Sequence, residues 1–95
     1  MVARIGKWQG SGEDLERWVV RSQDQVKPAV AQQSGLEGAL WLLDRDTGEA
    51  LTITLWEDEE AMAASERFRQ QTQSKTAEES GASVTTATYE VVDRV

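Results

Sequence analysis

Few side chains in this sequence have the chemistry that catalysis near neutral pH usually requires. The 95 residues include no histidine, no cysteine and no asparagine. Because histidine is the side chain whose ordinary pKa lies nearest neutrality, imidazole bases, imidazole metal ligands and Ser–His or Cys–His dyads are excluded. The lack of cysteine also excludes thiolate nucleophiles and disulfides. A catalytic base would therefore have to be an arginine, Tyr89 or a carboxylate.

Tyr89 and two arginines remain as candidate reactive groups. Tyr89 lies in a strand-type segment, where its hydroxyl could orient a phenolic substrate or act as a general acid. The alternative is a packing residue with its hydroxyl at the surface. Arg67 and Arg69 could stabilise an enolate or phenolate oxygen electrostatically. The alternative for these two is a solvated helix face of mixed charge.

The acidic residues do not have the spacing of a metal site. Consecutive helical positions diverge by about 100°, so the run Glu57–Glu60 cannot easily converge on one ion. Asp58 is instead a good helix N-cap, and the acids after it suit the positive end of the helix dipole. The segment DRDTGE lacks the spacing of a calcium loop and is predicted to be a hairpin turn. We predict no metal and no cofactor.

Composition and charge restrict the class of protein and its partners. The length predicts a single domain over residues 1–95. The net charge is −7 and there is no cluster of Lys and Arg, which argues against binding to nucleic acid or to an anionic membrane surface. No apolar run approaches the roughly 20 residues of a membrane span, and the N-terminal segment lacks the apolar region of a signal peptide. We therefore expect a cytoplasmic protein.

Apolar periodicity predicts four strands and two helices. The strands are expected at 2–8, 36–43, 50–56 and 84–92, with helices from 11 to about 35 and from 58 onward. Whether residues 70–80 are helix or loop stays open. The order β-α-β-β-α-β predicts an α+β, ferredoxin-like fold, with a four-stranded antiparallel sheet and helices on one face.

Several local signals support these boundaries. Ser11 and Asp14 have capping-box spacing at the start of the first helix. Pro28 predicts a kink or break in that helix just before it. Gly48 can supply the positive φ that the hairpin turn needs, and Gly81 is a plausible stop for the second helix.

Pairing Leu43 with Ala50 separates the two hairpin strands into two faces. One face is predicted to lie against the helices: Leu36, Gly38, Leu40, Leu42, Leu51, Ile53 and Leu55. The other is predicted to be uncovered in the monomer: Glu37, Ala39, Trp41, Leu43, Ala50, Thr52, Thr54 and Trp56. Since an uncovered apolar face of this kind needs a partner, we predict a homodimer packed sheet to sheet. Its interface candidates are Trp41, Thr52, Thr54 and Trp56.

The sequence resembles a known family in the segment SGLEGALWLLDRDTGEALTITLWEDEEAMAAS and the closing YEVV. A hairpin that ends in Trp, followed by a helix with an acidic cap, is similar to the antibiotic-biosynthesis-monooxygenase (ABM) group of dimeric α+β barrels. The resemblance covers most of the chain. It implies a dimeric α+β barrel and a ligand pocket between the second helix and the sheet.

The second helix could form one wall of such a pocket. From Ala61 to Phe68 its inward positions are mostly small, which could leave a cavity against the sheet; closer packing is the alternative. The pocket candidates are Trp18, Leu40, Ile53, Leu55, Met62, Phe68 and Tyr89.

Two alternative functions stay open, one implied by the resemblance and one favoured by the lack of a convergent set of catalytic residues. The first is a cofactor-independent monooxygenase acting on an aromatic or quinol-type small molecule. The second is a non-catalytic dimer of the same fold that binds a small apolar ligand or serves as an accessory protein. Haem degradation is not expected, because the haem-degrading members use an Asn, a Trp and a His. At the corresponding places this chain offers Arg4, Ile5 or Lys7 on the first strand, a residue near Ser65, and a residue near Lys75.

Overall fold

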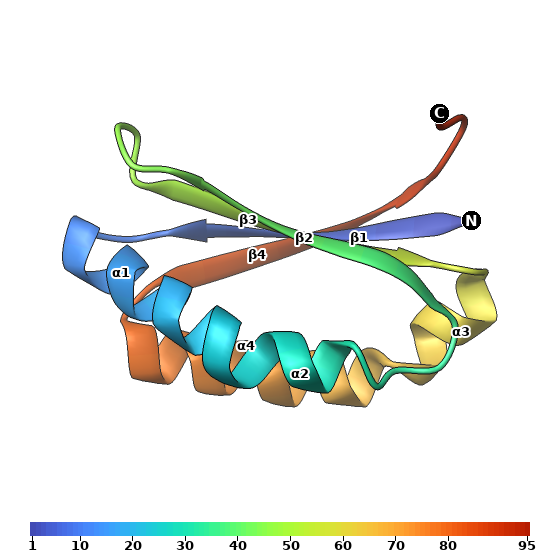
Figure 1. The fold of residues 1–95 in the computed structure, drawn as a ribbon, viewed down its shortest axis with the longest axis horizontal. Helices are drawn as coiled ribbons and strands as arrows, with labels where there is room; N and C mark the ends of the chain where they lie inside the picture. The colour runs from blue at the N-terminus through green and yellow to red at the C-terminus, as the bar shows by residue number, and fades with distance from the viewer.

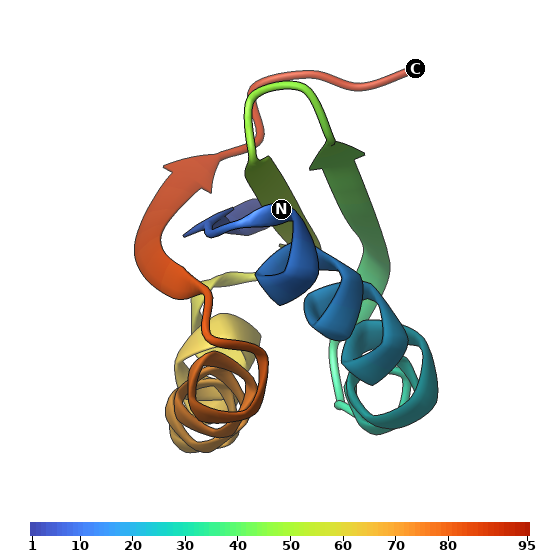
Figure 2. The same cartoon turned by 90° about the vertical axis from the view of Figure 1, so that its left-hand side faces the viewer.

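The computed structural model describes residues 1–95, and its elements follow the predicted β-α-β-β-α-β order. The strands are β1 (Val2–Gln9), β2 (Leu36–Asp44), β3 (Glu49–Trp56) and β4 (Ser83–Glu90). They form one antiparallel sheet in the order β2-β3-β1-β4. The helical segments are α1 (Gly12–Arg21), the π-helical turn η1 (Ser22–Val26), α2 (Lys27–Val30), α3 (Glu59–Ala64) and α4 (Glu66–Ser80). Figures 1 and 2 show these helices on one side of the sheet. No helix combines the length and the hydropathy needed to cross a bilayer.

The predicted helix caps are present. Ser11 and Asp14 form a reciprocal capping box, in which each side chain accepts a hydrogen bond from the other residue's backbone N–H at 3.1 and 3.0 Å. Asp58 caps α3 by accepting from the N–H of Ala61 at 2.8 Å. Gly81 ends α4 with φ at 87°, a left-handed conformation that favours glycine.

The first helical region contains a change of helix type where a kink or a break was predicted. The N–H of Lys27 bonds to the carbonyl of Ser22, five residues back, and Pro28 follows directly. In an α-helix, side chains four residues apart are rotated by about 40° relative to each other around the helix axis. A π turn contains more residues per turn, so it brings side chains at this spacing back to one face. The residues at this spacing are all buried: Trp18, Ser22, Val26 and Val30. The π turn therefore keeps one face of this region against the sheet and lets the chain pass Pro28 without breaking.

The second helical region is divided into α3 and α4, and residues 70–80 are helical. Polar contacts hold much of α4, because its buried side chains are Thr76 and Ser80. Arg21 Nε donates to Thr76 Oγ1 at 2.9 Å, and Arg17 Nε donates to the carbonyl of Ser80 at 3.0 Å. This helix therefore rests on arginines from α1 more than on an apolar seam.

The predicted hairpin register is confirmed from Gly38 to the turn. Leu43 lies opposite Ala50, and the pairing continues until an irregularity between Leu36 and Gly38. Gly48 in the turn has φ at 74°. The alternation of faces along β2 and β3 is therefore as predicted over most of the hairpin.

Which face the helices cover was predicted wrongly. Trp56 and Ala50 are 2% and 0% exposed beneath the helices, whereas Leu40 and Leu42 are 56% and 43% exposed on the opposite face. The register fixes which residues share a face, but both faces carry apolar residues. The helix-covered side is decided by the crossover connections, in which the chain leaving β1 packs α1 onto the face that carries Trp8. The leucine-rich face is the uncovered one.

Candidate functional site

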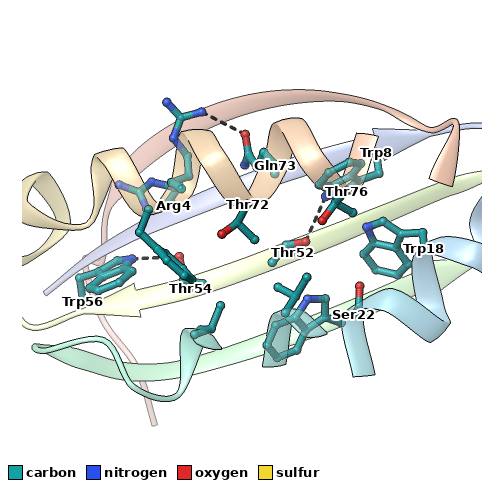
Figure 3. Close-up of a pocket in the computed structure, with 16 residues that line it drawn as sticks. Arg4, Trp8, Trp18, Ser22, Thr52, Thr54, Trp56, Thr72, Gln73 and Thr76 are labelled. Atoms are coloured by element: carbon teal, nitrogen blue, oxygen red, sulfur yellow. Dashed lines mark hydrogen bonds between the residues drawn. The ribbon is translucent and has the colours of Figure 1, made fainter. Parts of the chain in front are cut away.

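A cavity of about 60 Å³ lies between the sheet and the helices (Figure 3). Strands β1 and β3 form its floor, the first helical region one wall, and α4 the opposite wall. All four tryptophans of the chain line it: Trp8, Trp18, Trp41 and Trp56. Because these indoles come from four separate elements, only the tertiary fold brings them together.

Two of the tryptophans, Trp8 and Trp56, present aromatic surface to the cavity while their indole N–H groups donate to threonines of β3. Trp8 Nε1 donates to Thr52 Oγ1 at 3.1 Å, and Trp56 Nε1 donates to Thr54 Oγ1 at 2.9 Å. The rings of Trp8 and Trp18 lie 6.2 Å apart between centroids, tilted by 51°. Since buried indole N–H groups need acceptors, these threonines leave the ring faces free for apolar contact.

Small residues make room for the indoles. Ala50 lies directly opposite Trp8 across the β1–β3 pair and is fully buried. Gly6 also lines the cavity, where an added Cβ would lie 3.3 Å from Gln73 Nε2 and 3.4 Å from Trp8 Nε1. A larger residue at position 6 would therefore press into the space between β1 and α4.

Arg4 on β1 brings a positive charge into this mainly aromatic cavity. It is 6% exposed, and its guanidinium carbon lies 5.6 Å from the ring centroid of Trp56. It donates to Ser65 Oγ at 3.1 Å, and to the carbonyl of Met62 and to Glu66 Oε2 at 3.0 Å each. Burial lowers the pKa of Arg4; attraction to Glu66 opposes this, and repulsion from Arg69 adds to it.

Arg69 on α4 forms a second cationic group beside Arg4. Its Nη1 donates to Gln73 Oε1 at 3.0 Å and its Nη2 donates to Glu66 Oε1, whereas its buried Nε has no acceptor. The hydrogen bond from Arg69 is the main cause of a lowered pKa at Glu66; burial opposes it, and the positive charges of Arg69 and Arg4 add to it. Glu66 therefore stays ionised and bridges the two guanidiniums.

The predicted pocket residues separate into two groups. Trp18 and Phe68 line the cavity. Met62 contributes its carbonyl to Arg4 but is not among the lining residues. Four others lie outside the cavity, because their positions alternate onto the uncovered face: Leu40, Ile53, Leu55 and Tyr89. Tyr89, 56% exposed on β4, therefore cannot act within this cavity.

The residues that were predicted at a dimer interface lie on the helix-covered face of the sheet instead. Thr52 and Thr54 face the helices and accept the indole hydrogen bonds, and Trp41 and Trp56 line the cavity. This placement follows from the reversed assignment of the two sheet faces. It corrects the prediction that these four side chains meet a partner.

From the sequence, Arg4 was given no role in the pocket. Arg69 was named, together with Arg67, as a candidate to stabilise a substrate oxygen, with a solvated helix face as the alternative. The alternation Arg4–Gly6–Trp8 along β1 would have placed Arg4 on the same face as Trp8. The roof of the cavity also differs from the prediction. It is formed by α4 residues: Phe68, Arg69, Thr72, Gln73 and Thr76. The small residues of α3 do not line it.

The acidic segments serve local structure. The acids Glu59 and Glu60 occupy the first turn of α3 and are exposed. In the hairpin turn, Asp44 Oδ1 accepts from the N–H groups of Asp46 and Thr47. No group of three acidic side chains converges as a metal site would require.

The comparisons with known proteins rest on structure. No protein-family model matches the sequence, and no curated protein matches it significantly. A candidate antibiotic biosynthesis monooxygenase from Deinococcus radiodurans aligns with a TM-score of 0.75 at 20% identity, covering 100% of this chain and 96% of the other. A variant of SnoaB, a cofactor-independent oxygenase from Streptomyces nogalater, aligns with a TM-score of 0.73 at 14% identity, covering 99% and 95%.

A dimeric ferredoxin-like protein from an uncultured marine organism aligns with a TM-score of 0.70 at 15% identity, covering 99% of this chain and 96% of the other. At these identities the likeness concerns the fold. The resemblance to ABM-type proteins is confirmed at that level: the chain has the ferredoxin-like fold that these proteins share.

Proposed function

We propose that the protein binds a flat, electron-rich aromatic molecule between the sheet and α4, and oxygenates it without a cofactor. The observation that carries the proposal is the convergence of four tryptophans and a buried arginine on one cavity. Indole faces bind planar rings by dispersion and offset stacking. The SnoaB variant of the same fold is from a cofactor-independent oxygenase, which supports this class of reaction.

The reaction must suit a site without imidazole. A substrate such as anthrone has a CH₂ group opposite the carbonyl in its central ring. This CH₂ ionises readily because the resulting negative charge is delocalised through the flanking aromatic rings onto the carbonyl oxygen. Loss of a proton gives a carbanion that transfers an electron to O₂, and recombination forms a C–O bond to a peroxide. Cleavage of the O–O bond with loss of water leaves anthraquinone, so anthrone and O₂ give anthraquinone and water. The protein's part is to position the ring, exclude water and favour the anionic form.

Entry of such a ligand requires the cavity to enlarge. Sites for drug-sized ligands typically measure about 300–1,000 Å³, and this cavity measures about 60 Å³. The element best suited to move is α4, because its buried side chains are both polar and its ties to α1 run through Arg17 and Arg21. Helices with little apolar burial open at lower free-energy cost than core elements. We infer that α4 shifts outward when a ligand binds.

Oxygen uptake with anthrone and quinol-type compounds tests the activity, and quenching of tryptophan fluorescence tests binding separately. The cavity variant is Thr72→Phe, because Thr72 lines the cavity from α4. The matched control is Gln71→Phe, at the exposed neighbouring position of the same helix. We expect uptake in the wild type and in Gln71→Phe, and loss of both uptake and quenching in Thr72→Phe. Anthraquinone should appear in equal amount to the oxygen consumed.

A different pattern would favour the non-catalytic alternative. Quenching that Thr72→Phe abolishes, with no oxygen uptake above buffer, would refute the oxygenase and leave a binding or accessory protein. Equal behaviour of Thr72→Phe and the wild type would refute the cavity as the site.

We also propose that the protein forms a homodimer through its uncovered sheet face. Apolar side chains cover this face without any element above them: Ile5, Leu40, Leu42, Leu51, Ile53, Leu55 and Tyr89. Soluble monomers rarely expose so continuous an apolar surface. The dimeric ferredoxin-like protein of the same fold supports this assembly.

Light scattering after size-exclusion chromatography tests the dimer. Leu40→Lys should yield monomers, because it buries a charge within the proposed interface. The matched control is Val20→Lys on α1, since Val20 and Leu40 are almost equally exposed, at 57% and 56%. A monomeric wild type at micromolar concentration would refute the interface.

A further inference from the structure

Two cations share one anion where β1 approaches the start of α4. Glu66 accepts from Arg4 Nη2 at 3.0 Å with one carboxylate oxygen and from Arg69 Nη2 with the other. Both arginines line the tryptophan cavity, and Glu66 does not. The cluster therefore carries a net charge of +1 at the cavity, in a chain whose net charge is −7.

The bond between Arg69 and Glu66 leaves hydrogen-bonding capacity unused. The Nε and Nη2 atoms form one edge of a guanidinium, and this edge matches the two oxygens of a carboxylate in a bidentate pair. Glu66 engages the Nη2 of Arg69, while the Nε is buried without an acceptor. Leaving a buried donor unpaired is costly, so an acceptor that reached both atoms would bind favourably.

Glu66 can leave this position at modest cost. Its side chain is 46% exposed, so release would return its carboxylate to water. The guanidinium of Arg4, in contrast, is held by Ser65 and by the carbonyl of Met62 as well. It would stay in place when Glu66 departs. Arg4 thus forms the fixed part of the receptor, Arg69 is carried on α4, and the carboxylate between them is the exchangeable part.

We propose that the ligand is an aromatic acid, whose carboxylate replaces that of Glu66 between Arg4 and Arg69. Its ring lies among the tryptophans, with Trp56 next to the charge, because Arg4 is only 5.6 Å from that ring. This assignment rests on the proposed aromatic site and adds the charge of the ligand to it. A neutral aromatic molecule would leave Glu66 in place and gain only the ring contacts.

Calorimetric titration with 2-naphthoate and its neutral analogue 2-naphthamide tests the proposal. The wild type should bind the acid about tenfold more tightly than the amide, as one charge-assisted bidentate contact is worth about 1.4 kcal/mol or more. Arg69→Gln should bring the two affinities to about the same value, because the amide does not use the bidentate edge of Arg69. Arg67→Gln is the matched control, because Arg67 is an exposed arginine at the start of the same helix.

For a second variant, Glu66→Gln, we predict the opposite change in the affinity for 2-naphthoate. Glu66→Gln removes the competing carboxylate, so 2-naphthoate should bind several-fold more tightly, while 2-naphthamide is unaffected. Glu78→Gln, an exposed position of the same helix, controls for the change in net charge. If the role of Glu66 is purely structural, Glu66→Gln should instead have a lower thermal stability than the wild type and should not bind 2-naphthoate more tightly.

The outcomes separate this proposal from the function on which it rests. Equal binding of acid and amide by the wild type would overturn the arginine receptor and leave the aromatic site standing. Binding of neither probe would overturn both. Weaker binding of the acid by Glu66→Gln would contradict the exchange of carboxylates even if the wild type prefers the acid.

Discussion

Replacing Arg4 with methionine tests whether the buried guanidinium stabilises the fold or serves the cavity. Methionine keeps an unbranched apolar stem and removes the charge. Burial is the largest influence on the pKa of Arg4 and exceeds the attraction of Glu66, so the charged form is held at a cost. Replacing a buried ionic group with an apolar residue of similar volume is often neutral or stabilising.

The partners that Arg4 would leave behind are already satisfied. The carbonyl of Met62 also accepts from Ser65 Oγ at 2.7 Å and from the N–H of Ser65 at 3.1 Å. Glu66 keeps Arg69 and is partly exposed to water. Breaking a buried pair typically costs about 3–5 kcal/mol when it strands a charge, and no charge is stranded here. We therefore expect Arg4→Met to change the free energy of unfolding by less than about 1 kcal/mol.

Urea denaturation followed by tryptophan fluorescence measures this effect as a shift in midpoint at constant slope. Protein concentration must be held fixed, because dimer formation would make the midpoint depend on it. Trp56→Ala is the sensitivity control: Trp56 is 2% exposed, and its truncation should cost about 3–5 kcal/mol. A loss above about 3 kcal/mol in Arg4→Met would refute the reasoning and assign Arg4 to stability. Near-neutral stability together with loss of 2-naphthoate binding would assign it to the ligand.

Two further predictions concern the backbone and the first helix cap. Gly35→Ala should lower stability by about 1–3 kcal/mol, because Gly35 has φ at 79° and an added Cβ would lie 2.5 Å from the Cβ of Ala61. Thermal melts should show this as a drop of several degrees, with Gly12→Ala, which meets nothing within 4 Å, as the unaffected control. Asp14→Asn should flatten the dependence of stability on pH in acid. Hydrogen bonding from Ser11 lowers the pKa of Asp14. Its carboxylate therefore stabilises the fold above the unfolded-state pKa of about 3.9, and this contribution disappears as the pH falls through the lower folded-state value. Urea midpoints between about pH 6 and pH 2 would show it, and identical curves for variant and wild type would contradict it.

Local sequence accounts for most of the secondary structure. The helix caps involve hydrogen bonds between residues no more than four positions apart, so a short stretch of sequence predicts them. They are the capping box of Ser11 and Asp14, the N-cap at Asp58 and the helix stop at Gly81. The hairpin register is also local, since a two-residue alternation and a short turn specify it. The type of helix around Pro28 was missed, because a break and a π turn both relieve the clash of a proline.

The sequence by itself determined the order of the elements, the hairpin register and the exclusion of imidazole and thiolate chemistry. Only the tertiary structure decided which sheet face the helices cover, and therefore that Trp41 and Trp56 line a cavity while Leu40 and Leu42 are left uncovered. Both faces carry enough apolar surface to be buried, so composition cannot choose between them. The covered face is decided by the crossover connections between strands. These connections join residues far apart in the sequence, so a local pattern of residues does not predict them. The pairing of Arg4 with α4 has the same origin, because it joins residues about 60 positions apart.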